Sequence, residues 1–350
     1  MGEFLVPTGR IIKEYLEARG ISQKDLSHRI DVSEKHISNL LNGKARLTED
    51  MALKLERVMP DVSAGYWLNY EAKYREFLAR EKERDWLEGL DLKEVARRFH
   101  FKEVFKNTSM TLVEQADEML KILGVSSFDQ YRYALPNTAI EFMQDGGDSE
   151  AVVVWLKLCE EDIEEQNPAL EDKPYSKDRM RKSLPILKSI AYSTDLESSL
   201  KDCRKLFNQQ GVYFVVEPAI ANSKVRGALS TWKDHPAIFI SGRFKSHDHV
   251  WFAIFHEVVH LLQHYNPKQA IVSYEELASE KAKDDEANKL ARDFLVDASD
   301  YATFKSTGDF SEGSIRRFAA SQGVLPDIIV GFLQHDHEIG FADLSYMKRH

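Results

Sequence analysis

The chain has 350 residues and a formal net charge of −10, with 47 Lys and Arg against 57 Asp and Glu, which argues against a protein that coats nucleic acid non-specifically. This length predicts two or three domains with well-buried cores. Two cysteines, Cys159 and Cys203, are too few for a disulfide framework, and no signal peptide or apolar run of about 18 residues is evident, so we expect a cytoplasmic protein without membrane spans.

The first 60 residues have the pattern of a small helical bundle. Apolar spacing, together with capping and terminating residues, predicts helices at residues 10–19, 23–30, 34–41 and about 49–58. In the fourth of these helices, Ala52, Leu53 and Leu55 are expected to point inward. The second and third helices are short and flank a tight turn at residues 31–33, which matches a helix-turn-helix motif; an ordinary helical bundle is the alternative.

The second helix of such a motif, residues 34–41 here, places its N-terminal polar side chains against base edges in the major groove of DNA. The side chains in that position are Ser33, Glu34, Lys35, His36, Ser38 and Asn39. Gln23, at the start of the preceding helix, and Lys44 and Arg46, in the following loop, are placed to contact phosphates. The sequence therefore predicts a double-stranded DNA operator as a partner, and a homodimer, since paired modules read two half-sites.

Residues 1 to about 75, which include Tyr66-Trp67-Leu68-Asn69, resemble the DNA-binding domain of Xre-type repressors, and most closely that of HigA-type antitoxins. The resemblance implies a transcriptional regulator that acts as an antitoxin-like autorepressor. It also implies a cognate toxin or a regulatory protein as a second partner.

Residues 76–174 are predicted to be a helical connector. The patterns in and next to this segment predict helices at about residues 70–87 and 113–123, an exposed turn at 145–149 and a buried apolar segment at 152–158. Gly124 is expected to end the second helix. The acidic run from residue 159 to residue 172 is expected to be a solvated loop or helix face.

Farther along the chain, two short segments rich in β-branched and aromatic residues predict buried strands at residues 212–216 and 237–240. The dipeptides Glu217-Pro218 and His235-Pro236 are expected to form turns next to these strands. One strand of the resulting small sheet is expected to align an extended peptide by edge pairing.

The run His256-Glu257-Val258-Val259-His260 lies within the apolar segment 251–262 and carries the strongest chemical signal in the chain. On a helix, His256 and His260 lie on one face, so both imidazoles can bind one metal ion while Glu257 faces a metal-bound water. Zinc is the expected metal, because three protein ligands and an open position let it activate a water that attacks a peptide carbonyl. The pattern thus predicts Glu257 as a catalytic general base.

The third metal ligand is expected from an amphipathic helix at residues 283–295. Asp284 is the predicted ligand and Glu286 the reserve candidate; the alternative is that these acids only favour a helix N-terminus. Asn288 lies four residues after Asp284 on the same face and is expected to support a ligand by hydrogen bonding. His264 is expected either to support the site in the same way or to end the histidine helix.

These motifs and the segments around them resemble the ImmA/IrrE family of zinc peptidase-like proteins, from about residue 175 onward. The matching residues are Gly227-Ala228, Trp232, residues 238–241, Trp251-Phe252, Phe255-His256-Glu257, His260, His264, Ala287-Asn288, Ala291 and residues 330–335. The resemblance implies a zincin-like domain that binds Zn²⁺, with Asp284 at the position where the family has Glu. A helix-turn-helix domain in front of such a domain also resembles a known class of fused regulators.

Together these features predict a mainly α fold with a small α+β domain. It comprises a helix-turn-helix domain at residues 1–75, a helical connector at 76–174, and a zincin-like domain with a short sheet and C-terminal helices at 175–350. We expect a DNA-binding regulator whose zinc domain senses or binds a partner. The alternative is an active zinc endopeptidase that cleaves a regulatory protein, brought to DNA by the N-terminal domain. For that reaction, the sequence leaves the oxyanion donor open among His335, Arg243 and Tyr213.

Overall fold

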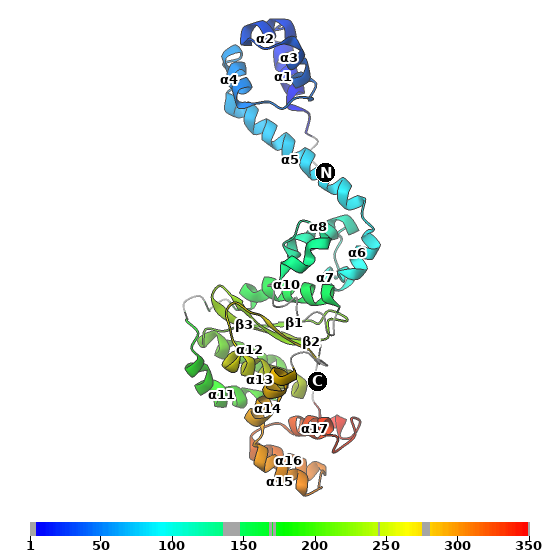
Figure 1. Cartoon of the computed structure of the whole chain (residues 1–350), viewed down its shortest axis with the longest axis vertical. Helices are drawn as coiled ribbons and strands as arrows, with labels where there is room; N and C mark the ends of the chain where they lie inside the picture. Colours follow the sequence, from blue (N-terminus) through cyan, green and yellow to red (C-terminus); the bar gives the residue numbers. More distant parts are fainter. Residues whose placement is uncertain are drawn as a thin grey trace. The chain divides into compact units, whose positions relative to one another are not determined.

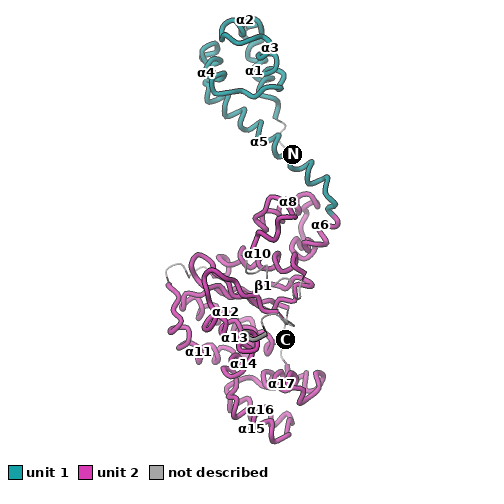
Figure 2. Tube along the Cα trace, in the orientation of Figure 1, with its two compact units in different colours: residues 1–92 teal, residues 93–350 magenta. Residues whose placement is uncertain are grey.

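The computed structural model describes residues 5–135, 148–167, 170, 173–243, 246–274 and 281–348 (Figure 1). The chain forms two compact units, residues 1–92 and 93–350 (Figure 2). One helix, α5 (Ala64–Glu88), runs through the boundary expected at residue 75. The division at residues 75 and 174 stays a prediction, and the turn expected at residues 145–149 lies outside the described residues up to Gly147.

The first unit begins with four short helices, α1 (Thr8–Ala18), α2 (Gln23–Ile30), α3 (Glu34–Leu41) and α4 (Glu49–Val58). Local capping fixes where the last three start, since the side chains of Ser22, Ser33 and Thr48 each accept a hydrogen bond from the backbone N–H three residues later. The second, third and fourth helices have the predicted bounds. The inward position expected for Leu53 is wrong, because that side chain is 52% exposed.

The core of the first unit holds α3 close against α1. A Cβ atom on Gly9 would lie 1.9 Å from the backbone oxygen of Leu40, so only glycine permits this approach of the two helices. Trp67 of α5 is fully buried and meets the ring of Tyr15 edge-on at a centroid distance of 5.2 Å. The first contact brings α3 against α1, and the second joins α1 to α5.

The second unit opens with helices that precede a sheet. They are α6 (Leu92–Arg98), α7 (Phe101–Val104), α8 (Leu112–Leu123), the 3₁₀ helix η1 (Phe128–Ala134), α10 (Ser149–Gln166), α11 (Lys177–Ala191) and α12 (Leu196–Gln209). Gly124 ends α8 in the left-handed conformation, as predicted. The acidic run begins on α10, where Cys159 and Ile163 are buried, Glu161, Glu164 and Glu165 are exposed, and Glu160 and Asp162 are partly exposed.

The sheet of the second unit has four strands, β1 (Tyr213–Glu217), β2 (Val225–Trp232), β3 (His235–Ser241) and β4 (Ile271–Tyr274), in the order β1-β3-β2-β4. β1 and β3 are parallel, and β2 is antiparallel to both β3 and β4. The turn expected at His235-Pro236 is wrong: these residues belong to β3, and Lys233 and Asp234 make the turn with positive φ angles of 44° and 64°. Helix α10 covers one face of the sheet, and α12 and α13 (His247–Gln263) cover the other (Figure 1).

Helix α13 lies at the centre of the larger core, and Trp251 and Phe255 on it are fully buried. After β4 come α14 (Lys281–Leu295), α15 (Ala298–Ser306), α16 (Glu312–Gln322), α17 (Pro326–His335) and the 3₁₀ helix η2 (Ser345–Met347). The predicted mainly helical fold with a small sheet in its C-terminal part is confirmed. In the described part of the chain, no helix combines the length and the apolar character needed to cross a membrane.

Candidate metal centre and DNA-binding face

The two histidines of the His-Glu-Val-Val-His run lie side by side on α13. The Nε2 atoms of His256 and His260 are 3.0 Å apart, and both side chains are fully buried. From α14, Asp284 places its Oδ1 atom 3.5 Å from Nε2 of His256 and 3.3 Å from Nε2 of His260. One donor atom from each residue lies within 4.8 Å of the others, a spacing compatible with one metal ion.

The charges of these three side chains suit a cation. Burial and the neighbouring guanidinium of Arg226 lower the pKa of His256 to about 3, which leaves a neutral imidazole able to bind metal. Burial opposes ionisation of Asp284, but hydrogen bonds with His256 and His260 outweigh it and hold the pKa of that carboxyl below its usual value. Two imidazoles and one carboxylate form the donor set of many catalytic zinc sites.

The helices around the centre supply hydrogen bonds that orient its ligands. Asn288, one turn after Asp284 on α14, has its Oδ1 2.9 Å from Nδ1 of His256, so that nitrogen donates and Nε2 is left toward the metal position. His264 has its Nδ1 3.1 Å from Nδ1 of His260. Glu286, the reserve ligand, has a side chain 55% exposed and lies 3.6 Å from His264, so the structure places it beside that histidine and not with the three donors.

Glu257 points from the same helix toward the sheet. Its carboxylate is fully buried against Gly227 of β2, and burial raises its pKa. Within the residues that the structure describes, neither carboxylate oxygen makes a hydrogen bond of normal geometry. The Ser273 hydroxyl of β4 lies close enough to lower the pKa of this carboxyl, but burial outweighs that effect.

Arg226 is a site residue that the sequence patterns did not indicate. It lies on β2, and its Nη2 lies 3.2 Å from Nε2 of His256 and donates to Oδ1 of Asn288 at 3.3 Å. Its guanidinium also lies over the ring of Phe252, 5.6 Å from the centroid. Arg226 is distant in sequence from all three donors, so no local spacing could reveal that the sheet brings it to them.

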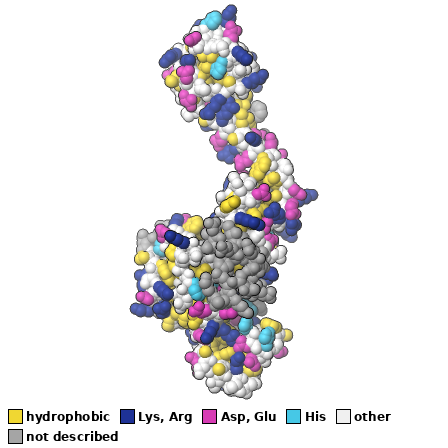
Figure 3. All heavy atoms as spheres, viewed as in Figure 1, with side chains coloured by type: hydrophobic (Ala, Val, Ile, Leu, Met, Phe, Trp, Pro, Cys, Tyr) yellow, Lys and Arg dark blue, Asp and Glu magenta, His cyan; other side chains and the backbone are white. Residues whose placement is uncertain are grey.

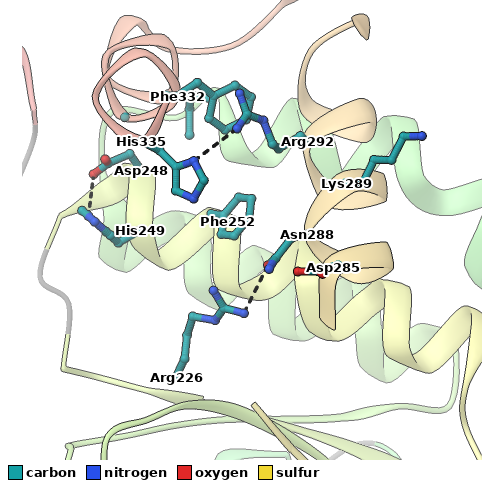
Figure 4. A pocket seen from close by; sticks show the side chains of 12 residues that line it. Arg226, Asp248, His249, Phe252, Asp285, Asn288, Lys289, Arg292, Phe332 and His335 are labelled. Atoms are coloured by element: carbon teal, nitrogen blue, oxygen red, sulfur yellow. Dashed lines mark hydrogen bonds and ion pairs between the residues drawn. The ribbon is translucent and has the colours of Figure 1, made fainter. Parts of the chain in front are cut away.

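A cavity of about 430 Å³ opens beside Arg226 and Asn288 (Figure 4). Its walls come from β2, α13, α14 and α17, with the rings of Phe252 and Phe332 facing it. The remaining lining residues are Asp248, His249, Asp285, Lys289, Arg292, Ile328, Gly331 and His335. The cavity is therefore continuous with the groups that orient His256.

The three residues that the sequence left as candidates for the oxyanion donor differ in their position relative to the cavity. His335 lines the cavity, although its side chain is 81% exposed. Tyr213 lies on β1, with its ring 5.8 Å from that of His235, and Arg243 follows β3. Neither of these two lines the cavity as the described residues define it.

In the first unit, the side chains expected to contact DNA lie on or beside α3. Gln23, Ser33, Glu34, Lys35, His36, Lys44 and Arg46 are exposed, and Ser38 and Asn39 are partly exposed. The Ser33 hydroxyl also caps α3 by accepting the backbone N–H of His36 at 3.3 Å. Lysines and arginines are spread over the surface of this unit among acidic side chains (Figure 3).

Comparison with protein families identifies both predicted domains. Residues 12–67 match a helix-turn-helix family, and residues 208–326 match the IrrE N-terminal-like domain of the M78 peptidases. The chain therefore carries an Xre-type helix-turn-helix domain and, after it, an IrrE N-terminal-like domain. The second match contains β1 to β4, the three metal-binding candidates and Glu257.

Curated relatives are similar to short stretches of the chain. Virulence-associated protein A of Dichelobacter nodosus is 32% identical over 60 residues, which is 17% of this chain and 59% of the relative. An uncharacterized HTH-type transcriptional regulator of Haemophilus influenzae is 35% identical over 66 residues, or 19% of this chain and 61% of the relative. The chain thus spans about three fifths of the length of these relatives.

Proposed function

We propose that this chain is a DNA-binding transcriptional regulator that carries a zinc-binding, peptidase-like domain. The observation that carries the regulatory part is the capped helix α3, which exposes Lys35 and His36 at its N-terminal end within a matched helix-turn-helix domain. In such a domain, these positions face base edges, while residues of the following loop contact phosphates. One such module covers only a half-site of DNA, so we expect a homodimer that binds an operator with two-fold symmetry.

Binding of the purified full-length protein to the DNA upstream of its own gene tests this function. Electrophoretic mobility shift should show a specific complex that Lys35→Ala weakens at least about tenfold, since a base contact contributes on the order of 1–3 kcal/mol. Lys13→Ala, an exposed lysine on α1, serves as the matched control and should bind as the unmodified protein does. Equal loss in both variants, or no preference over unrelated DNA, would contradict the proposal.

The narrower regulatory role is that of an antitoxin-like autorepressor in the cytoplasm. Support comes from the similarity of residues 1 to about 75 to HigA-type antitoxins. A cognate toxin would then be encoded next to this chain, and co-expression of the two should restore growth that the neighbour alone arrests. Normal growth with the neighbour alone, or arrest that persists with both, would remove the antitoxin role and leave the regulator.

A second function, zinc-dependent endopeptidase, is favoured by one specific observation. Glu257 is buried next to the three candidate ligands, and its carboxylate has no hydrogen-bond partner of normal geometry among the described residues. Zinc held by His256, His260 and Asp284 would polarise a peptide carbonyl and lower the pKa of a bound water.

The chain's own residues supply the rest of that chemistry. Glu257 accepts the proton that the attacking water loses and donates it to the amine that leaves, so that one C–N bond breaks as one C–O bond forms. Arg226, fixed against His256 and Asn288, is the candidate donor to the oxyanion, because its guanidinium keeps its charge at neutral pH.

Glu257→Gln separates the two functions. The variant should keep its zinc and its operator binding and lose all cleavage, because glutamine cannot accept a proton from water. Repression that persists in this variant would show that cleavage is dispensable for regulation. Cleavage that persists at the rate of the unmodified protein would rule out Glu257 as the base.

A further inference from the structure

We infer that Arg226 of β2 lowers the affinity of the candidate metal centre for a divalent cation, so that zinc leaves the centre more readily than its three candidate ligands alone would allow. This inference rests on the proposed zinc-binding function and names a residue that regulates occupancy of the same centre. Three features of the molecule carry it: an irregularity in β2, the contacts that hold the guanidinium, and the charge that it places beside a metal-binding nitrogen.

A β-bulge in β2 brings Arg226 to the centre. Val225 pairs with Tyr274 of β4, and the next pair joins Gly227 to Ser273. Arg226 is therefore an extra residue on β2, and such a residue bends the strand and redirects its side chain. In a regular strand, neighbouring side chains point to opposite faces of the sheet. At this bulge, Arg226 and Gly227 both lie against residues of α13, so two successive positions of β2 face the centre.

The guanidinium of Arg226 is held in place by three contacts. Its Nη2 lies 3.2 Å from Nε2 of His256, which is the nitrogen left toward the metal position, and donates to Oδ1 of Asn288 at 3.3 Å. Figure 4 shows the side chain reaching from β2 toward Asn288, next to the ring of Phe252. The guanidinium lies 5.6 Å from the centroid of that ring. A guanidinium held in this way keeps a positive charge beside the centre at neutral pH.

The charge of Arg226 opposes a cation at the same donors. A metal-binding histidine is usually supported by a carboxylate, a backbone carbonyl or a water, and such partners strengthen the ligand. His256 instead has the amide of Asn288 on one nitrogen and a guanidinium beside the other. Like charges about 4 Å apart near a protein surface repel strongly enough to change an equilibrium constant by more than tenfold. The guanidinium therefore weakens the binding of a cation at Nε2 of His256.

Arg226 also shares a hydrogen-bond acceptor with the metal-binding histidine. Oδ1 of Asn288 accepts from Nδ1 of His256 at 2.9 Å and from Nη2 of Arg226 at 3.3 Å. The hydrogen bond that orients His256 thus has a competitor, and orientation of this kind contributes to metal affinity. Both effects of Arg226 lower the affinity, so its removal should raise it.

The zinc affinity of the full-length protein tests this role without any measurement of activity. Competition with a chromophoric zinc chelator gives the Kd at about pH 8, which is above the ordinary histidine pKa of about 6.5, so protons compete little for the imidazoles. Arg226→Met has a neutral side chain of similar length. It should bind zinc at least about tenfold more tightly than the unmodified protein and release it to excess chelator more slowly. A variant that merely misfolds would bind zinc more weakly, which is the opposite result.

Two further variants separate charge from packing. Arg226→Gln is a second neutral variant that can still donate to Asn288, and it should also bind zinc more tightly. Arg226→Lys keeps the positive charge and is the matched control, so its Kd should stay close to that of the unmodified protein. Equal or weaker binding in both neutral variants would overturn the inference, and so would a gain in Arg226→Lys as large as that in Arg226→Met.

The outcomes separate this inference from the proposed zinc-binding function. If the unmodified protein and both neutral variants bind zinc with equal affinity, the zinc centre stands and the role of Arg226 is removed. If only the neutral variants bind zinc, the role of Arg226 is supported and the unmodified protein is not a zinc protein. If none of the four proteins binds zinc, both proposals fail. Cleavage enters none of these measurements, so a contact of Arg226 with an oxyanion does not affect the result.

Discussion

Gly227 of β2 lies directly against the side chain of Glu257 on α13. A Cβ atom at position 227 would be 2.7 Å from Oε1 and 2.9 Å from Cγ of Glu257, closer than non-bonded atoms approach in proteins. The absent side chain thus leaves the room in which the carboxylate lies beside the three candidate metal ligands. Strand β2 therefore shapes the candidate centre at two successive positions, through Arg226 and through Gly227.

Gly227→Ala should displace Glu257 and abolish peptide cleavage while the protein keeps its zinc and its DNA binding. The added methyl group would also lower the free energy of unfolding by about 1–3 kcal/mol, the usual cost of overpacking a core. Peptide cleavage, zinc content and urea denaturation measure the three effects. Gly242→Ala is the matched control, because its Cβ would meet backbone atoms only at 3.4 Å or more. Equal cleavage by both variants would show that the contact with Glu257 is unimportant.

Zinc content should depend on Asp284 and not on Glu286. We expect about one zinc per chain in the purified protein by elemental mass spectrometry, none in His260→Ala and at least about tenfold weaker binding in Asp284→Ala, since each variant removes one of the three candidate ligands. Glu286→Ala should retain zinc, because its carboxylate is half-exposed and reaches only His264. Loss of zinc in Glu286→Ala with retention in Asp284→Ala would exchange the roles of the two acids.

Removal of the metal should destabilise the second unit. Burying His256, His260 and the Asp284 carboxylate costs free energy that a bound cation would offset. An ion that binds only the folded protein also stabilises it by mass action. Chelation should lower the Tm of the unmodified protein and leave the Tm of His260→Ala unchanged. An identical Tm with and without chelator in both proteins would mean that no ion is bound.

Local signals explain why the first unit could be predicted closely from its sequence. The caps at Ser22, Ser33 and Thr48 act within three residues, so three of the four helix bounds follow from short stretches. The position of Leu53 could not be predicted, because apolar spacing on a ten-residue helix does not say how wide its buried face is. By contrast, the spacing of Asp284 and Asn288 predicted that both side chains lie on one face of their helix, and the structure places both beside His256.

Long-range packing determines the parts of the site that no local pattern predicted. Arg226 reaches His256 only because β2 lies against α13, and the cavity requires α17 to pack against α13. Residue type alone made His335 a candidate, and the structure puts it at the cavity wall. The prediction treated Pro236 as a turn residue, but proline is also compatible with the first residues of a strand. Pro236 therefore lies in β3, and the turn lies just before it at Lys233-Asp234.

The salt dependence of DNA binding should distinguish phosphate contacts from base contacts. Lys44→Ala or Arg46→Ala should weaken binding to all sequences alike and reduce the slope of log K against log salt by about 0.9, since one fewer counterion is released. His36→Ala should instead reduce discrimination between operator and unrelated DNA at an unchanged slope. Binding titrations at several salt concentrations measure both quantities, and an unchanged slope in Lys44→Ala and Arg46→Ala would remove that loop from the interface.

The folding stability of the second unit should depend on a carboxyl group outside the metal centre. Glu217 ends β1, and its backbone oxygen accepts hydrogen bonds from Gly242 at 2.7 Å and from the Trp155 indole at 3.5 Å. Burial, together with a hydrogen bond to Asp162 and the charge of that residue, raises the pKa of Glu217 to about 8. The folded protein thus keeps a proton on Glu217 at a pH where an ordinary glutamate has lost it.

Between pH 5 and 8, Glu217 should therefore make the protein less stable as the pH rises. The unfolded chain releases this proton near the ordinary glutamate pKa of 4.5 while the folded chain holds it up to about 8, so the folded state binds more protons and the free energy of unfolding falls with pH. Because the side chain is partly exposed, solvent screening limits the loss of unfolding free energy to about 1–2 kcal/mol.

Glu217→Gln should remove this decline of stability with pH, as measured by urea denaturation of the variant and the unmodified protein at each pH. Glu197→Gln, whose side chain is 81% exposed, is the control and should retain the decline. Parallel pH profiles for Glu217→Gln and the unmodified protein would show that Glu217 ionises normally in the folded state.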